Sequence, residues 1–183
     1  MYFRHTPKHY SGALIALHWL TLLLLIAVYA LIELRGIYPK GSDAYQLMKT
    51  WHFMLGLTVL GLLPIRLLLR AVGGATPPIH PPLAVAQERL AKLVHLLLYL
   101  FLLVMPVLGW LTLSAQGKVI PFFGLELPPL LGADKALGHQ LEEIHETIGE
   151  LGYYLIGLHA AAALFHHYWT RDDTMRRMML RRD

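Results

Sequence analysis

The sequence predicts an all-α fold, an integral membrane bundle of four helices. Of its 183 residues, 56% are hydrophobic and 15% are charged, whereas soluble domains carry about 25% charged residues. Mean hydropathy is +0.48. Four apolar stretches reach the roughly 20 residues that a helix needs to cross a bilayer. The chain length fits a single membrane domain over residues 1–183.

The four predicted spans cover about residues 13–32, 52–69, 93–113 and 144–169. The first is longer than the apolar region of a signal peptide and contains a histidine, so we interpret it as a retained helix. Pro64 and Pro106 lie inside spans, where neighbouring helices allow a kink. Residues 71–82 are rich in Gly and Pro and indicate an irregular linker. Residues 114–138 are partly apolar, and we expect them to cap the membrane surface.

Charge counts predict the orientation of the bundle. With a cytoplasmic N-terminus, eleven Lys and Arg residues fall on the inner side and five on the outer side, which favours both termini inside the cell. The inner group is Arg4, Lys8, Arg66, Arg70, Arg89, Lys92, Arg171, Arg176, Arg177, Arg181 and Arg182, and the outer group is Arg35, Lys40, Lys49, Lys118 and Lys135. The net charge of +4 therefore indicates contact with lipid headgroups and not binding of nucleic acid.

Histidines inside the spans are the candidate functional residues. The chain has eleven histidines and no cysteine, which excludes disulfides, thiolate-held iron–sulfur clusters and cysteine nucleophiles. Ionisable groups within a membrane span are costly and suggest a function. His145 and His159 are fourteen residues apart on the fourth span, which places them on one helix face about 21 Å apart.

Two further histidines lie at matching depths. His52 opens the second span on the outer side, level with His145, and His18 lies early in the first span, nearer the depth of His159. Two histidines from facing helices can hold a haem. We therefore predict two b-type haems, an outer one between His52 and His145 and an inner one between His18 and His159. Interhelical hydrogen bonds are the better explanation for any one of these histidines, but haem ligation is the better explanation for two pairs at matching depths.

Three more residues are candidates near the inner haem. His95, at the inner end of the third span, could replace His18 or His159 as a ligand, but we favour a contact with a haem propionate or a quinone. Arg66 and Arg70 could neutralise propionates, and anchoring by the positive-inside rule explains them equally well. His166 and His167 end the fourth span and are predicted to be interfacial.

With these residues in place, the sequence resembles the bacterial cytochrome b561 family. The shared features are "ALHW" with His18, "WHF" with His52, and "EIHETIGELGYYLIGLHAAAALFHHYW" with His145 and His159. That family includes the membrane cytochrome subunits of nickel–iron hydrogenases and formate dehydrogenases. "ELRGIYPKG" and "TPPI" make the chain look most like its superoxide oxidases. The resemblance implies an oxidoreductase of the bacterial inner membrane that oxidises superoxide at the outer face and reduces ubiquinone.

Attraction of superoxide would need basic groups near the outer haem. The candidates are Arg35, Lys40, Lys49 and Lys118. Seven acidic residues accompany the five outer basic ones, so any attraction has to be local. The outer acids are Glu33, Asp43, Glu126, Asp134, Glu142, Glu143 and Glu146.

Two other functions fit parts of the pattern. The same two haems could serve as the electron-transfer subunit of a hydrogenase or dehydrogenase, with a redox partner protein docked outside. A histidine-lined ion or proton transporter without haem is the alternative from another class. Such transporters often contain internal repeats and broken helices, and this sequence shows no repeat.

Overall fold

The computed structural model describes residues 10–73 and 76–179 and consists mainly of four long helices. They are α1 (Gly12–Leu34), α2 (Asp43–Val72), α3 (Val85–Ala115) and α4 (Lys135–Phe165). The short 3₁₀ helix η1 (Arg35–Ile37) follows α1, and the π-helical turn η2 (His166–Thr170) extends α4. All four helices are long and apolar enough to cross a membrane. The predicted all-α membrane bundle of four helices is thus confirmed.

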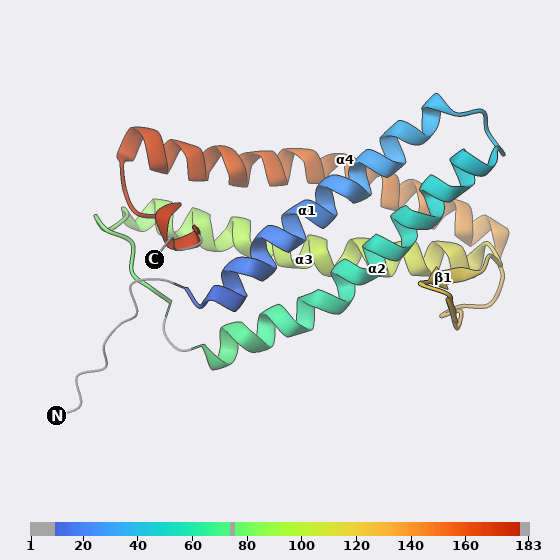
Figure 1. Cartoon of the computed structure of the whole chain (residues 1–183), viewed down its shortest axis with the longest axis horizontal. Helices are drawn as coiled ribbons and strands as arrows, with labels where there is room; N and C mark the ends of the chain where they lie inside the picture. The colour runs from blue at the N-terminus through green and yellow to red at the C-terminus, as the bar shows by residue number, and fades with distance from the viewer. Residues whose placement is uncertain (1–9, 74–75, 180–183) are drawn as a thin grey trace.

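The helices form two antiparallel pairs. The first pair is α1 with α2 and the second is α3 with α4, and the pairs meet mainly where α2 contacts α3. Figure 1 shows α1 and α2 running obliquely across α3 and α4, with the start of α1 and the end of α4 at the same end of the bundle. We call this the terminal end. The opposite end, where α1 turns into α2, carries the short strands and is called the hairpin end.

Side-chain caps define where three of the helices begin. Ser11 and Ser42 each accept a hydrogen bond from the backbone three residues ahead, at the first turns of α1 and α2. Asp134 does the same for two amides of α4. These caps satisfy backbone donors that have no partner within the helix.

Large apolar side chains point outward along the whole bundle. Leu23, Leu68 and Leu151 are each at least 60% exposed, and similar residues occur on every helix. A soluble protein rarely exposes so much contiguous apolar surface. Within the helices, the hydroxyls of Thr21, Thr58 and Thr112 donate to the carbonyl four residues earlier. Polar groups are thus satisfied internally, as a bilayer requires.

A two-stranded hairpin covers part of the hairpin end. Strands β1 (Ile120–Phe122) and β2 (Leu125–Leu127) pair antiparallel through a two-residue turn with positive φ at Phe123 and Gly124. Such a turn matches the twist of a hairpin. Ile120 packs with Leu57 of α2 and Leu113 of α3 in a buried cluster, so the predicted cap is an ordered β-hairpin anchored on two helices.

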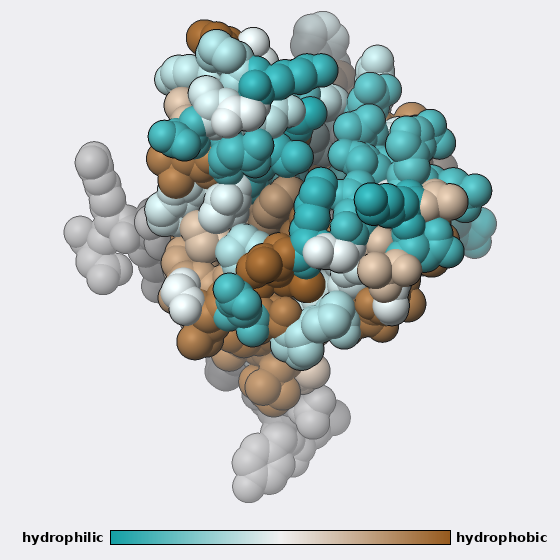
Figure 2. Space-filling model, turned by 90° about the vertical axis from the view of Figure 1, so that its right-hand side faces the viewer, coloured by the Kyte–Doolittle hydropathy of each residue, from teal (hydrophilic) through white to brown (hydrophobic). Residues whose placement is uncertain are grey.

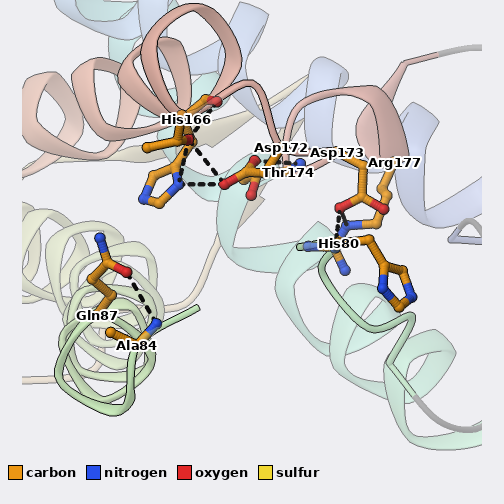
Figure 3. Close-up of polar contacts among 9 residues, drawn as sticks. His80, Ala84, Gln87, His166, Asp172, Asp173, Thr174 and Arg177 are labelled. Carbon is orange, nitrogen blue, oxygen red and sulfur yellow. Dashed lines mark hydrogen bonds and ion pairs between the residues drawn. The ribbon is translucent and has the colours of Figure 1, made fainter. Parts of the chain in front are cut away.

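The segment after α4 folds back over the terminal end. His166 Nδ1 lies 2.5 Å from the Asp172 carboxylate, and Asp173 accepts a hydrogen bond from the His80 backbone amide at 2.9 Å (Figure 3). Arg177 is buried and donates to the carbonyl of Pro77. Trp19 Nε1 of α1 donates to the Met178 carbonyl. This segment therefore ties together α1, the α2–α3 connection and the end of α4.

Candidate functional site

The structure brings His52 and His145 together at the hairpin end. Their ring centroids are 6.2 Å apart, with the rings inclined by 75°. His52 Nδ1 lies 2.9 Å from the Val28 carbonyl oxygen of α1. A donor bond there places the proton on Nδ1 and leaves Nε2 free to bind a metal. His145 Nδ1 is buried and has no hydrogen-bond partner among the residues that the structure describes. We refer to these two residues as the hairpin-end pair.

His18 and His159 form a second pair with nearly the same geometry. Their ring centroids are also 6.2 Å apart, with the rings inclined by 67°. An imidazole–metal bond is about 2 Å long, so two rings that face one metal from opposite sides have centroids roughly 6 Å apart. The spacing of this terminal-end pair, like that of the hairpin-end pair, leaves room for one metal ion between the rings.

His95 lies beside the terminal-end pair. Its ring centroid is 5.3 Å from that of His159, which is closer than two rings that face one metal from opposite sides would be. His95 Nδ1 bonds to the Ala91 carbonyl one turn earlier in its own helix, at 2.6 Å. This geometry favours His18 over His95 as the partner of His159.

The two candidate arginines differ in position. Arg66 approaches the terminal-end pair, with a guanidinium nitrogen 3.4 Å from His18 Nδ1 and Nε 3.5 Å from the Tyr99 hydroxyl. Arg70, one turn further along α2, is exposed. If His18 binds metal through Nε2, its Nδ1 carries a proton and cannot accept from Arg66. The guanidinium then becomes available to an anionic group beside the pair.

A cavity of about 670 Å³ surrounds the hairpin-end pair, with walls from all four helices. Cofactor pockets typically occupy about 300–1,000 Å³. Three lining glycines, Gly56, Gly109 and Gly149, leave the walls of α2, α3 and α4 shallow. A Cβ atom at Gly109 would lie 3.4 Å from the His145 ring. Flat walls around two facing imidazoles fit a planar porphyrin, so the residues present match the donor set of a haem.

All four basic residues singled out from the sequence line this cavity. Arg35, Lys40, Lys49 and Lys118 lie at its hairpin-end mouth, and four glutamates also line the cavity. The glutamates are Glu33, Glu142, Glu146 and Glu150. Figure 2 shows hydrophilic residues gathered on this end of the molecule, with apolar residues between them near the centre. Four basic and four acidic side chains thus line the cavity, so the arrangement of the charges and not their number decides whether an anion is attracted.

Neutral side chains hold several of these charges in place, and the sequence analysis did not identify these neutral residues. Arg35 and Lys49 both lie 5.9 Å from the centre of the Tyr45 ring, as cation–π partners. Gln116 donates to Glu142 at 2.7 Å and accepts from Lys118 at 2.7 Å. The Arg35–Tyr45 and Gln116–Glu142 contacts join different segments, so spacing along the chain could not reveal them.

These observations define a membrane helical bundle with two pairs of facing histidines, a class of protein that can carry haem within the bilayer. The family model for prokaryotic cytochrome b561 matches residues 9–180. The chain belongs to this family of membrane electron-transfer proteins, which bind b-type haem.

Relatives cover nearly the whole chain. "Cytochrome b561 homolog 1" of Escherichia coli (strain K12) is 40% identical over 175 residues, which are 96% of this chain and 99% of that protein. "Probable superoxide oxidase CybB" of Yersinia pestis is 38% identical over 172 residues, 94% of this chain and 96% of that protein. "Cytochrome b561 homolog 2" of Escherichia coli (strain K12) is 28% identical over 180 residues, 98% and 95% of the two chains.

Proposed function

We propose that this protein is a dihaem b cytochrome of the bacterial inner membrane that oxidises superoxide and reduces ubiquinone. The observation that carries the proposal is the repeated pair geometry, with two sets of histidine rings at 6.2 Å joined by one face of α4. The similarity to a relative named a probable superoxide oxidase supports the choice of substrate. In this proposal the hairpin end faces the periplasm and both termini lie in the cytoplasm.

The histidines supply the ligands. His52 and His145 hold one haem and His18 and His159 the other, and haem b when bound supplies one-electron chemistry. The Val28 carbonyl fixes the orientation and tautomer of the His52 ring. The shallow glycine walls leave room for a planar group beside the rings.

The basic residues at the mouth attract the substrate. Superoxide carries one negative charge, and Arg35, Lys40, Lys49 and Lys118 raise its concentration near the hairpin-end pair. Gln116 restrains Glu142, and the Tyr153 hydroxyl donates to Glu33 at 2.8 Å. Two of the acidic groups, Glu142 on α4 and Glu33 on α1, are thus bound to neutral donors.

Quinone reduction takes place at the terminal end in this proposal. Two superoxide ions yield two oxygen molecules, and their two electrons with two protons convert one quinone to quinol. Arg66 and Arg70 are placed to contact propionates, and His95 presents an imidazole beside His159 for a propionate or quinone oxygen. Anionic lipid headgroups surround the basic residues at this end.

The test begins with the haem content of detergent-purified protein, measured as the pyridine haemochrome. Two haems b per chain are expected. A preparation without haem would instead support the alternative of a histidine-lined ion or proton transporter. The second step adds superoxide and a soluble ubiquinone analogue to the purified protein alone. Quinol formation without another protein is expected, whereas a requirement for a dehydrogenase partner would instead support the electron-transfer subunit.

A further inference from the structure

A tightly packed layer lies midway between the two histidine pairs. Gly152 is seven residues from both His145 and His159, or about 10 Å along α4 from each. It is one of the few buried residues of α4. A Cβ atom there would come within 2.5–2.6 Å of the Phe101 ring and would collide with the Tyr29 hydroxyl. The missing side chain of Gly152 therefore lets two aromatic residues reach the centre of the bundle.

All four helices contribute to this layer. Phe101 of α3 is 8% exposed and Val59 of α2 is 3% exposed, and both line the cavity of the hairpin-end pair together with Tyr29. Val59 follows His52 by seven residues, the same offset that separates Gly152 from His145. Because both helices run toward the terminal end, these residues form the floor of the cavity.

Phe101 occupies the central place in the layer. Tyr29 is directed toward α4, since its hydroxyl donates to the Gly149 carbonyl at 2.7 Å and its ring lies 4.3 Å from the exposed Tyr153. The Phe101 ring has no polar group to satisfy and packs on Gly152, between the two pairs along the bundle axis. His95 lies six residues before Phe101 on α3, so the same helix reaches the terminal-end pair.

We propose that Phe101, seated on Gly152, is the bridging residue for electron transfer between the two haem sites. This inference rests on the proposed dihaem function. One electron passes from the reduced hairpin-end site to the oxidised terminal-end site, and no bond forms or breaks and no proton moves. Electron tunnelling slows steeply across empty space and is faster through packed atoms, so an aromatic ring filling the midpoint shortens the gap that the electron has to cross.

The test compares Phe101→Leu with the wild type. Because the chain has no cysteine, Glu126→Cys on the exposed strand β2 provides a single attachment point for a photoreductant at the hairpin end. A light pulse injects one electron, and the second kinetic phase of haem reduction reports transfer between the sites. Haem content and both midpoint potentials are measured on the same samples, which tests the dihaem assignment separately from the bridge.

Phe101→Leu is expected to retain two haems with unchanged potentials and to slow the second phase several-fold. Phe165→Leu, the same change at an exposed position of α4, is the matched control and should show the wild-type rate. A wild-type rate in a two-haem Phe101→Leu protein overturns the bridge while leaving the dihaem proposal intact. If Phe101→Leu loses haem, Phe101→Met, which keeps similar volume without a ring, is measured instead, and a wild-type rate there has the same meaning.

Discussion

The two histidine pairs share one ring separation but are held in different ways. At the hairpin end, His52 bonds to a backbone carbonyl of α1, and the pair lies in a cavity partly covered by the β-hairpin. At the terminal end, His18 contacts the side chain of Arg66, and a third imidazole, His95, lies next to His159. One ring of the first pair is thus held by a backbone atom, whereas the second pair is bordered by an arginine and a third imidazole side chain.

The two ends therefore differ in how easily the surroundings of their histidine rings can change. A backbone carbonyl cannot be removed by substitution, so the orientation of His52 is fixed as long as α1 and α2 remain packed. A guanidinium or imidazole can move or be replaced, and residues that contact a ligand from outside tune its affinity and the potential of its metal. We therefore expect substitutions around the terminal-end pair to change electronic properties, and those around the hairpin-end pair to change assembly.

Replacing the histidines should have the largest effect. His145→Ala and His159→Ala should each reduce the haem content from two per chain to one, because each removes an axial ligand from a different pair. His95→Ala should retain both haems, since its ring lies too near that of His159 for the two to bind one metal from opposite sides. The pyridine haemochrome assay measures all three variants. Loss of a haem in His95→Ala would show that the terminal-end pair has been assigned incorrectly.

A glycine contact offers a way to disturb the hairpin end alone. A Cβ atom at Gly138 would lie 2.8 Å from the Gln116 side chain and 3.3 Å from the backbone of Ala115. Gly138→Ala should therefore destabilise the α3–α4 contact, by about 1–3 kcal/mol as for other overpacked sites, and displace Gln116 from Glu142. Thermal unfolding in detergent measures the loss. Gly132→Ala, which meets nothing within 4 Å, is the control, and equal melting temperatures for the two variants would refute the packing argument.

The helices and the pairs of histidines were predictable because both leave a periodic signal in the chain. Long apolar stretches identify the spans, and a separation of fourteen residues places His145 and His159 on one helix face without tertiary information. The predicted basic set at the outer side also converged on one cavity. In each case the property depends on residues within one helix, or on the order of the helices across the membrane.

Contacts between distant segments were not predictable. The hairpin has strands of only three residues, too short for an alternating pattern, and Phe123 occupies a positive-φ position that usually favours Gly or Asn. His166 was predicted to be interfacial, but its partner Asp172 is evident only after the chain reverses at Arg171. Residues 1–9 and 180–183, which include Arg4, Lys8, Arg181 and Arg182 of the orientation argument, lie outside the described residues.

Removing Arg66 should change the midpoint potential of the haem at the terminal-end pair. Arg66→Leu deletes a positive charge next to His18, so the oxidised haem at that site is stabilised and its midpoint potential should fall by tens of mV, where about 59 mV corresponds to 1.4 kcal/mol. Arg89→Leu is the matched control, because Arg89 is exposed near the start of α3 at the same end of the bundle and water screens its charge. Redox titration followed by absorbance measures both. An equal shift in the two variants would mean that Arg66 acts only through the general charge of this end.

The smallest expected effect is on stability, and it comes from Asp172 in the segment after α4 that folds over the terminal end. Burial raises the pKa of the Asp172 carboxyl, but hydrogen bonds from Thr174, His166 and Thr170 outweigh burial and hold its pKa below the usual value. A carboxyl whose pKa is lower in the folded state stabilises that state at pH values above its unfolded pKa of about 3.9. This stabilisation is lost as the pH falls through the folded pKa.

Asp172→Asn should therefore lower the melting temperature at neutral pH, and its difference from the wild type should shrink once the pH falls below about 4. Thermal unfolding in detergent at a series of pH values measures this difference, in which titration of the remaining groups cancels. Glu143→Gln serves as the control, because its ion pair with His139 is exposed and such pairs contribute little. If the difference in melting temperature between the wild type and Asp172→Asn stays constant down to pH 3, the carboxylate holds the closing segment through its shape and not through its charge. The contrast between a backbone-held end and a side-chain-held end would then weaken.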